Sequence, residues 1–228
     1  MQIETLATAD AVAARAAQLI ASEARTAVTA RGRFVMAVSG GRTPWQMLRA
    51  LANEDVPWAY VHVVQVDERI APEGDKDRNL THLRESLLSH APLPESHIHA
   101  MPVNAADLAQ ACRDYTTTLE SLCGTPAVLD LAHLGLGSDG HTASLIPGDP
   151  VCHVQDAEVA LTGLYQNRHR MTLTYPILNR SRRILWVVTG AEKKEMVPRV
   201  ISADPTIPAG PISQENAILL LDAEAAGK

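Results

Sequence analysis

A glycine-rich segment places a carboxylate and an imidazole two residues apart. Asp139 and His141 lie in the run Gly137-Ser138-Asp139-Gly140-His141, directly after an apolar stretch from Val128 to Leu136. The apolar stretch predicts a buried strand, and catalytic groups lie at the ends of such strands in open α/β folds. Because histidine titrates near neutral pH, we expect general base chemistry at this strand end.

Three glycines of the same run also match the GxGxxG pattern of dinucleotide-binding turns. Such a site needs a long helix that opens at the third glycine and an acidic residue at the end of the next strand. Here the turn Pro147-Gly148-Asp149-Pro150 limits any helix to about two turns. Asp156 and Glu158 precede the next strand-like stretch instead of ending it. The context disfavours a nicotinamide cofactor, and we expect no cofactor at all.

Polar clusters follow other predicted strands as well. The segment Ser39-Gly40-Gly41-Arg42-Thr43-Pro44 is a glycine turn that leads into a helix N-terminus, where free N–H groups favour a phosphate. An ordinary tight turn with Thr43 as the helix N-cap is the alternative. Gly190-Ala191-Glu192-Lys193 repeats the geometry, with Lys193 one turn inside a helix, although a single lysine there is usually a surface residue.

Two arginines can add positive charge near these strand ends. Arg170 opens a predicted strand, and its alternative interpretation is an exposed strand-end charge. Arg69 ends the cluster Asp67-Glu68-Arg69, for which a surface ion network of little energetic weight is the alternative. Asp139 as a turn cap and His141 as a buried structural histidine also remain alternatives.

Strand-like and helix-like segments alternate along the chain, which predicts an α/β fold: a single open, mostly parallel, Rossmann-like sheet with helices on both faces, in one domain spanning 1–228. The predicted helices are Thr8 or Asp10 to Ala30, a helix beginning at Pro44, Asn79–Leu88, Ala105–Leu122 and Lys193–Val200. The predicted strands are Phe34–Val38, Val61–Val66, Ile98–Met101, Val128–Leu136, Glu158–Leu164 and Met171–Thr174 as a hairpin, Ile184–Val188 and Ala217–Leu221.

Composition excludes several classes of protein. The formal charge of −6 argues against nucleic acid or an anionic membrane as a partner, so an anionic substrate needs a local cluster of cations. No basic segment precedes an apolar run at the N-terminus, and no stretch of 18 residues is uninterruptedly apolar. The three cysteines are odd in number and lack CxxC spacing. We expect a reduced, cytoplasmic protein without an obligatory protein partner.

A metal hydrolase is not supported by the histidine spacing. His97 and His99 form the only close pair, and with Glu95 they make a partial site without a fourth ligand. We expect surface histidines and no metal.

Five segments, in order and spacing, resemble the glucosamine-6-phosphate isomerase/6-phosphogluconolactonase family. They are SGGRTP at 39–44, VDERIAP at 66–72 with Asn79, GLGSDGHTASLIPG at 135–148, RMTLTYPILN at 170–179 and VVTGAEKK at 187–194. The resemblance covers about Phe34 to Val200 and is to the 6-phosphogluconolactonase branch. It implies hydrolysis of 6-phospho-D-glucono-1,5-lactone to 6-phosphogluconate, in the pentose phosphate pathway, without metal or organic cofactor. Arg78 stands where the family usually has serine, which leaves open how the loop after Arg69 closes over substrate.

The resemblance also implies roles for individual residues. His141 matches the proposed general base, and Asp139 the adjacent carboxylate. Arg69 matches a basic residue of the pocket, whose target is phosphate or lactone. The remaining residues match positions that bind the sugar phosphate: Ser39, Gly40, Gly41, Thr43, Asp67, Arg170 and Lys193.

The chemistry fits a lactonase, because a lactone is an activated ester that a water activated by an imidazole can attack. No GxSxG nucleophile motif occurs. A glucosamine-6-phosphate deaminase or isomerase is the alternative; it needs a further acid after the histidine, where this chain has Ser144-Leu145-Ile146. A sugar-phosphate sensor would carry a basic DNA-binding extension, and no such segment occurs in the chain.

Overall fold

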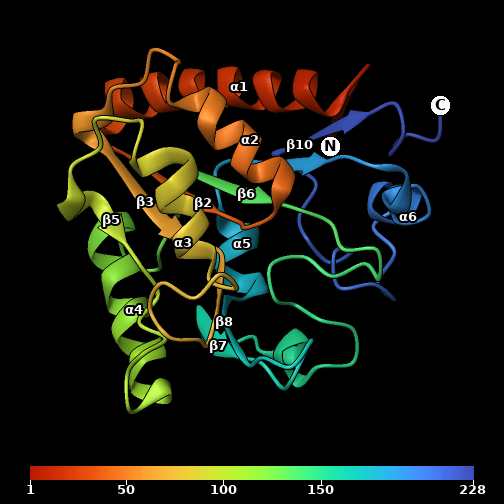
Figure 1. The fold of residues 1–228 in the computed structure, drawn as a ribbon. Helices are drawn as coiled ribbons and strands as arrows, with labels where there is room; N and C mark the ends of the chain where they lie inside the picture. Colours follow the sequence, from red (N-terminus) through yellow and green to blue (C-terminus); the bar gives the residue numbers. More distant parts are fainter.

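A computed structural model describes residues 1–228 and has at its centre a seven-stranded sheet in which every pairing is parallel (Figure 1). The strand order is β1-β10-β9-β6-β2-β3-β5. The bounds are β1 Gln2–Leu6, β2 Phe34–Val38, β3 Val61–Gln65, β5 Ile98–His99, β6 Leu131–Leu134, β9 Ile184–Val188 and β10 Ala217–Asp222. The open parallel sheet confirms the predicted fold class.

Both faces of this sheet are covered, and this explains why its central strands are largely apolar. In β2 the side chains of Phe34, Met36 and Val38 enter one hydrophobic core, whereas Val35 and Ala37 enter the other. Successive side chains of a strand point to opposite faces. A parallel strand with helices on both sides therefore reads as a continuous apolar run.

Helices α1, α2 and α3 supply the core on one face, and α4, α5 and α6 supply the core on the other. Figure 1 shows α1 and α2 on the opposite side of the sheet from α4. The bounds are α1 Ala9–Arg31, α2 Arg42–Leu51, α3 Asn79–Leu83, α4 Leu108–Cys123, α5 Tyr175–Arg180 and α6 Met196–Ile201. Of the two predicted caps of α1, Thr8 is the one used: its hydroxyl accepts from Ala11 N at 3.2 Å.

A second, antiparallel sheet of three strands lies beside the first, in the order β4-β8-β7. Its strands are β4 Asp67–Arg69, β7 Val159–Leu161 and β8 Arg170–Leu173. The β7–β8 hairpin was predicted, but β4 was not. Val66 connects the two sheets, because its N–H donates to Val38 O at 3.0 Å and its carbonyl accepts from Leu173 N at 2.8 Å.

Several predicted bounds were wrong. Helix α2 begins at Arg42, two residues before Pro44, because Gly41 takes a φ of 124° and lets the chain turn directly into the helix. Lys193 ends a short 3₁₀ helix, Ala191–Lys193, and lies before α6 instead of inside it. Strand β1 was missed. No helix opens at Gly140, where turns follow one another, so the context that a dinucleotide site requires is absent.

The cysteines and the close histidine pair lie outside the strand-end segments. All three cysteines are free, and burial raises the pKa of Cys112 to about 11. His97 and His99 are half-buried and stack on His62, with ring centroids 4.1 and 5.3 Å away, so they are only partly at the surface. No helix combines the length and apolar character needed to cross a bilayer.

Candidate active site

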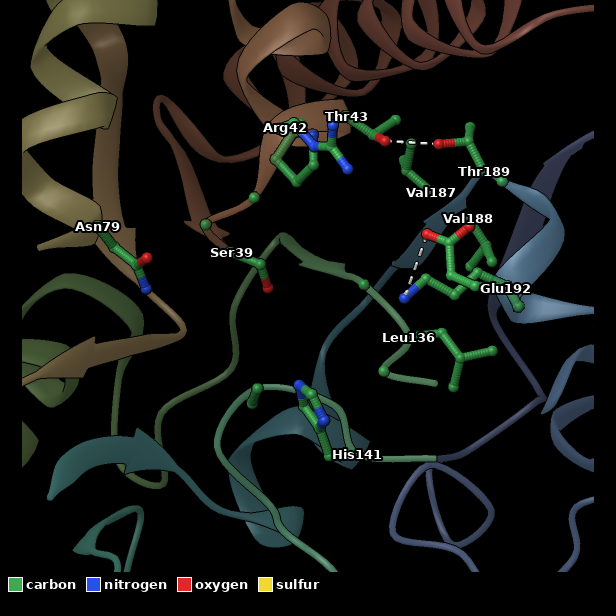
Figure 2. Close-up of a pocket in the computed structure, with 18 of the residues that line it drawn as sticks. Ser39, Arg42, Thr43, Asn79, Leu136, His141, Val187, Val188, Thr189 and Glu192 are labelled. Carbon is green, nitrogen blue, oxygen red and sulfur yellow. Dashed lines mark hydrogen bonds and ion pairs between the residues drawn. The ribbon is translucent and has the colours of Figure 1, made fainter. Parts of the chain in front are cut away.

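A cavity of about 580 Å³ opens at the carboxyl ends of the parallel strands (Figure 2). Ligands bind at this edge in open α/β sheets, because the loops that leave the strands converge there. All of the predicted site residues except Asp139 line the cavity: Ser39, Gly40, Gly41, Thr43, Asp67, Arg69, His141, Arg170 and Lys193. Residues that lie far apart in the sequence therefore share one cavity.

His141 and Asp139 form a hydrogen-bonded pair at the wall of this cavity. His141 Nδ1 lies 2.6 Å from Asp139 Oδ1, and the same oxygen accepts from His141 N at 3.1 Å. Gly137 lies so close to the ring that a Cβ atom there would approach His141 Nδ1 to 2.1 Å. Asp139 itself does not line the cavity. Because Nδ1 is engaged by the carboxylate, Nε2 is the nitrogen left to exchange protons.

The Asp139 carboxylate is strongly stabilised in its charged form. The hydrogen bond from the His141 side chain is the main cause that holds the pKa of Asp139 well below its usual range. Its second oxygen, Oδ2, accepts from the hydroxyl of Tyr165 at 2.9 Å. Asp139 is therefore a permanent acceptor, and this favours the tautomer in which His141 Nδ1 carries the proton.

The N-terminus of α2 forms another wall of the cavity. No side chain caps this helix, so its first N–H groups are free to bind an anion. Thr43 is not the N-cap: it lies inside α2, and its hydroxyl lies 2.5 Å from that of Thr189. Figure 2 shows Thr43 and Arg42 on the opposite side of the cavity from His141.

The turn before α2 is fixed by two contacts that explain its residue types. Ser39 N donates to His133 Nδ1 at 3.2 Å, and Ser39 Oγ donates to the carbonyl of His133 at 2.9 Å. The proton of the serine hydroxyl is therefore already used in a hydrogen bond to β6. A Cβ atom at Gly40 would come within 2.0 Å of Asn79 Oδ1, so a larger residue cannot occupy that position without displacing Asn79.

Arg170 is buried, with only 4% of its surface exposed, so the interpretation of an exposed strand-end charge was wrong. Its Nη1 lies 3.4 Å from Ser144 Oγ, and Ser144 Oγ in turn donates to Asp67 Oδ2 at 2.6 Å. Its Nη2 donates to Gln166 Oε1 at 3.1 Å. Burial is the main cause that lowers the pKa of Arg170. A buried cation without a direct carboxylate partner is suited to an anionic ligand.

Arg69 reaches the same cavity from β4. Its guanidinium donates to the carbonyl of Asp77 at 3.1 Å and to the side chain of Asn79. Lys193 approaches from the loop after β9, where Nζ lies 3.8 Å from Glu192 Oε1. The cavity thus contains several cations although the chain as a whole is negative.

The neighbouring Glu68 is fully buried, so the interpretation of residues 67–69 as a surface ion network was wrong. Its oxygens accept from Asn79 N and Leu80 N at 2.7 and 2.9 Å, which caps α3 from another element. Arg78 forms a buried ion pair with Glu68 at 3.1 Å and donates to the carbonyl of Ala71 at 3.0 Å. Arg78, which departs from the family pattern, therefore anchors the loop after β4 to Glu68 and Ala71.

Other residues of the cavity were not among the predicted set. Arg42 and Glu192 lie within the two glycine-containing turns that were predicted to bind phosphate, so their proximity to predicted residues was an available signal. Asn79 was noted only as part of the family pattern. Gln166 had no signal, because it lies at the tip of the β7–β8 hairpin and reaches the cavity through the fold.

Fold and site together define an open α/β protein with a cavity that is lined by several cations and by a histidine paired with a carboxylate. Residues 7–220 match the model of the family described as glucosamine-6-phosphate isomerases/6-phosphogluconolactonase. The chain belongs to this family.

Curated relatives and solved structures agree with this assignment. A 6-phosphogluconolactonase of Synechocystis is 34% identical, and the match covers 98% of this chain and 96% of the relative. The 6-phosphogluconolactonase of Mycobacterium tuberculosis is also 34% identical, with 99% and 97% covered. The crystal structure of a 6-phosphogluconolactonase from Thermotoga maritima superposes with a TM-score of 0.86 at 26% identity, covering 97% of this chain and 98% of that one. A monomeric glucosamine-6-phosphate deaminase shares the fold, with a TM-score of 0.87 at 21% identity, covering 100% and 99%.

Proposed function

We propose that this protein hydrolyses 6-phospho-D-glucono-1,5-lactone to 6-phospho-D-gluconate. Relatives named as 6-phosphogluconolactonases match over nearly the whole chain. The observation that carries the proposal is the arrangement of the cavity: the Asp139–His141 pair faces a space that Arg69, Arg170 and Lys193 also line. A base and an anion clamp in one cavity match a substrate with an ester at one end and a phosphate at the other.

In this proposal the phosphate binds at the N-terminus of α2, and Lys193 and Arg170 line the same cavity. Free N–H groups and the helix dipole favour a dianion there, and the arginine adds charge-assisted hydrogen bonds. His141 lies across the cavity from this helix end in Figure 2. A substrate held by its phosphate therefore extends toward the base with its lactone ring.

The reaction needs one water and one base. His141 Nε2 takes a proton from the water while the water oxygen bonds to the lactone carbonyl carbon, and the carbonyl electron pair moves onto its oxygen. When the tetrahedral intermediate collapses, the bond between the carbonyl carbon and the ring oxygen breaks, and the imidazolium returns the proton to that oxygen. Asp139 stabilises the imidazolium in between. Arg69 or a backbone N–H group of the glycine loop stabilises the oxyanion.

A covalent serine intermediate is not supported by the site. Ser144 is fully buried, and its hydroxyl donates to Asp67 and not to a histidine. The hydroxyl of Ser39 donates to a backbone carbonyl. Neither oxygen is activated as a nucleophile would be.

The alternative, a glucosamine-6-phosphate deaminase, is disfavoured by the carboxylates. No acid follows His141 before Asp149, whose two oxygens accept from Val151 N and Gly163 N at 2.9 and 2.8 Å, away from the cavity. Asp222 lines the cavity, but its oxygens accept from Gly190 N and Ala225 N. Glu192 and Glu224 also line the cavity, but neither stands directly after the histidine, where a deaminase needs its further acid.

Two assays of the purified protein test the proposal. Acid release from freshly made 6-phosphogluconolactone should exceed the spontaneous rate and should be insensitive to EDTA. Glucosamine 6-phosphate should give no ammonia. Ammonia release at a rate comparable to lactone hydrolysis would instead establish the deaminase activity.

A further inference from the structure

The tip of the β7–β8 hairpin contacts both halves of the proposed site through Tyr165. The hydroxyl of Tyr165 donates to Asp139 Oδ2 at 2.9 Å. Its ring meets His141 edge-on, with centroids 5.6 Å apart and an interplanar angle of 67°. The guanidinium carbon of Arg170 lies 4.9 Å from the centre of the same ring. One side chain therefore contacts the base, its carboxylate and the buried cation.

Tyr165 supplies contacts to Asp139 and Arg170 that no other residue supplies. Asp139 Oδ1 is occupied by His141, whereas Oδ2 accepts only from Tyr165. Since 36% of the Asp139 side chain is exposed, only the two contacts of Oδ1 with His141 would orient the carboxylate without this donor. Arg170 Nε is buried and has no hydrogen-bond partner, and the Tyr165 ring lies within cation–π distance of the same guanidinium group.

The hairpin tip holds Tyr165 in a fixed place. Tyr165 and Arg168 exchange two backbone hydrogen bonds, at 3.0 and 3.1 Å, around a two-residue turn. The central residues Gln166 and Asn167 have φ values of 50° and 62°, as in a type I′ turn without glycine. Arg168 ties the tip to Asp75 and Asp77, at 3.2 Å from each. The strained turn and the tether keep the tyrosine over the site.

We propose that Tyr165 is a positioning residue with two separable roles: its hydroxyl orients Asp139 for His141, and its ring holds Arg170 for the phosphate. This inference rests on the proposed lactonase function. Burial, followed by the bond to Asp139, raises the pKa of Tyr165. The hydroxyl is therefore protonated at neutral pH and acts as the donor.

The two roles are tested by two substitutions with different steady-state effects. Tyr165→Phe removes the hydroxyl and keeps the ring, so kcat should fall about fivefold to tenfold with KM within about twofold of the wild-type value. Tyr165→Leu removes both, so kcat should fall similarly and KM should also rise about fivefold. Tyr60→Phe is the matched control, because Tyr60 is 54% exposed and precedes the amino end of β3, whereas the cavity opens at the carboxyl ends of the strands.

A double-mutant cycle separates positioning from a general structural effect. In an Asp139→Asn background, Tyr165→Phe should lower kcat no further, because the hydroxyl acts only through the carboxylate. A further loss of about fivefold in that background, or a wild-type kcat in the single variant, would overturn the role of the hydroxyl. Equal KM values for the Phe and Leu variants would overturn the role of the ring. A wild-type protein that fails to hydrolyse the lactone would instead overturn the proposed function.

Discussion

Arg69 and Arg170 lie directly opposite each other in the antiparallel ladder between β4 and β8. Like charges in this position destabilise a sheet, and Arg170 is buried as well. The Asp67 carboxylate reaches Arg170 only through the hydroxyl of Ser144. The two guanidinium groups therefore face each other and neither forms a direct ion pair with a carboxylate, so a bound dianion would compensate their charge.

Arg170→Ala should therefore weaken substrate binding more than catalysis. Loss of charge-assisted hydrogen bonds worth about 1.5–3 kcal/mol should raise KM about 10- to 100-fold, with kcat little changed. Inorganic phosphate should raise the melting temperature of the wild type and have less effect on the variant. Arg113→Ala, on the exposed surface of α4, is the control. An unchanged KM for the phosphorylated lactone would contradict the clamp.

His141→Ala should lower kcat by about 100-fold or more and leave KM nearly unchanged, because the phosphate contacts lie on other elements. Steady-state rates corrected for spontaneous hydrolysis measure both constants. The matched control is His90→Ala, at an exposed position outside the cavity. If the His141 variant kept the wild-type kcat, another group would have to act as the base.

Stability should depend on pH through His133, which lies beneath Ser39. Its Nδ1 accepts from Ser39 N, and burial lowers its pKa to about 3. Below the ordinary histidine pKa of about 6.5, the unfolded chain binds a proton that the folded protein does not. The free energy of unfolding should thus fall by about 1.4 kcal/mol per pH unit from about pH 6.5 toward pH 3 through this group alone.

Urea unfolding at pH 7, 6 and 5 measures this slope. His133→Asn keeps an acceptor for Ser39 but cannot take up the proton, so its slope should be smaller than that of the wild type. His90→Asn should not change it. Equal slopes for the wild type and the His133 variant would show that this histidine is protonated in the folded protein.

Arg78→Ala should reduce the free energy of unfolding by about 3 kcal/mol, because it leaves the buried carboxylate of Glu68 without its cation. Arg84→Ala is a useful comparison, since Arg84 forms an exposed pair with Glu95 at 3.1 Å and should change stability by less than about 1 kcal/mol. Denaturant unfolding of the two variants gives the difference. Similar decreases in the free energy of unfolding of both variants would mean that the buried Arg78–Glu68 pair contributes no more to stability than the exposed pair.

The amino-acid sequence predicted those strands that consist of a continuous apolar run. Strands β2 and β9 have the predicted bounds, since each is an apolar run buried on both faces and followed by a polar residue and glycine. Strand β4 was missed because Asp67-Glu68-Arg69 has no apolar residue, and its carboxylates are buried only through hydrogen bonds to distant elements. Strand β1 was missed because it is a largely exposed edge strand.

In the candidate site, too, some residues could be predicted from their neighbours in the sequence and others could not. Ser39, His141 and Lys193 belong to segments whose residue types and position after predicted strands favoured a pocket, although an ordinary turn, a structural histidine and a surface lysine remained alternatives. Tyr165 and Gln166 lie on a polar hairpin tip, and nothing near them in sequence indicates that the turn folds back onto Asp139 and Arg170. Long-range contacts of this kind become visible only in the assembled fold.

Val66 has a mechanical consequence for the enzyme. Because this single residue bonds to β2 on one side and to β8 on the other, the parallel sheet and the antiparallel sheet share a backbone junction without a flexible linker. The wall that carries the helix α2 N-terminus and the wall that carries Arg170 therefore cannot swing apart at this point. Separating the two sheets at this junction would break a backbone hydrogen bond, so we expect substrate to enter and product to leave without a large movement of one sheet against the other.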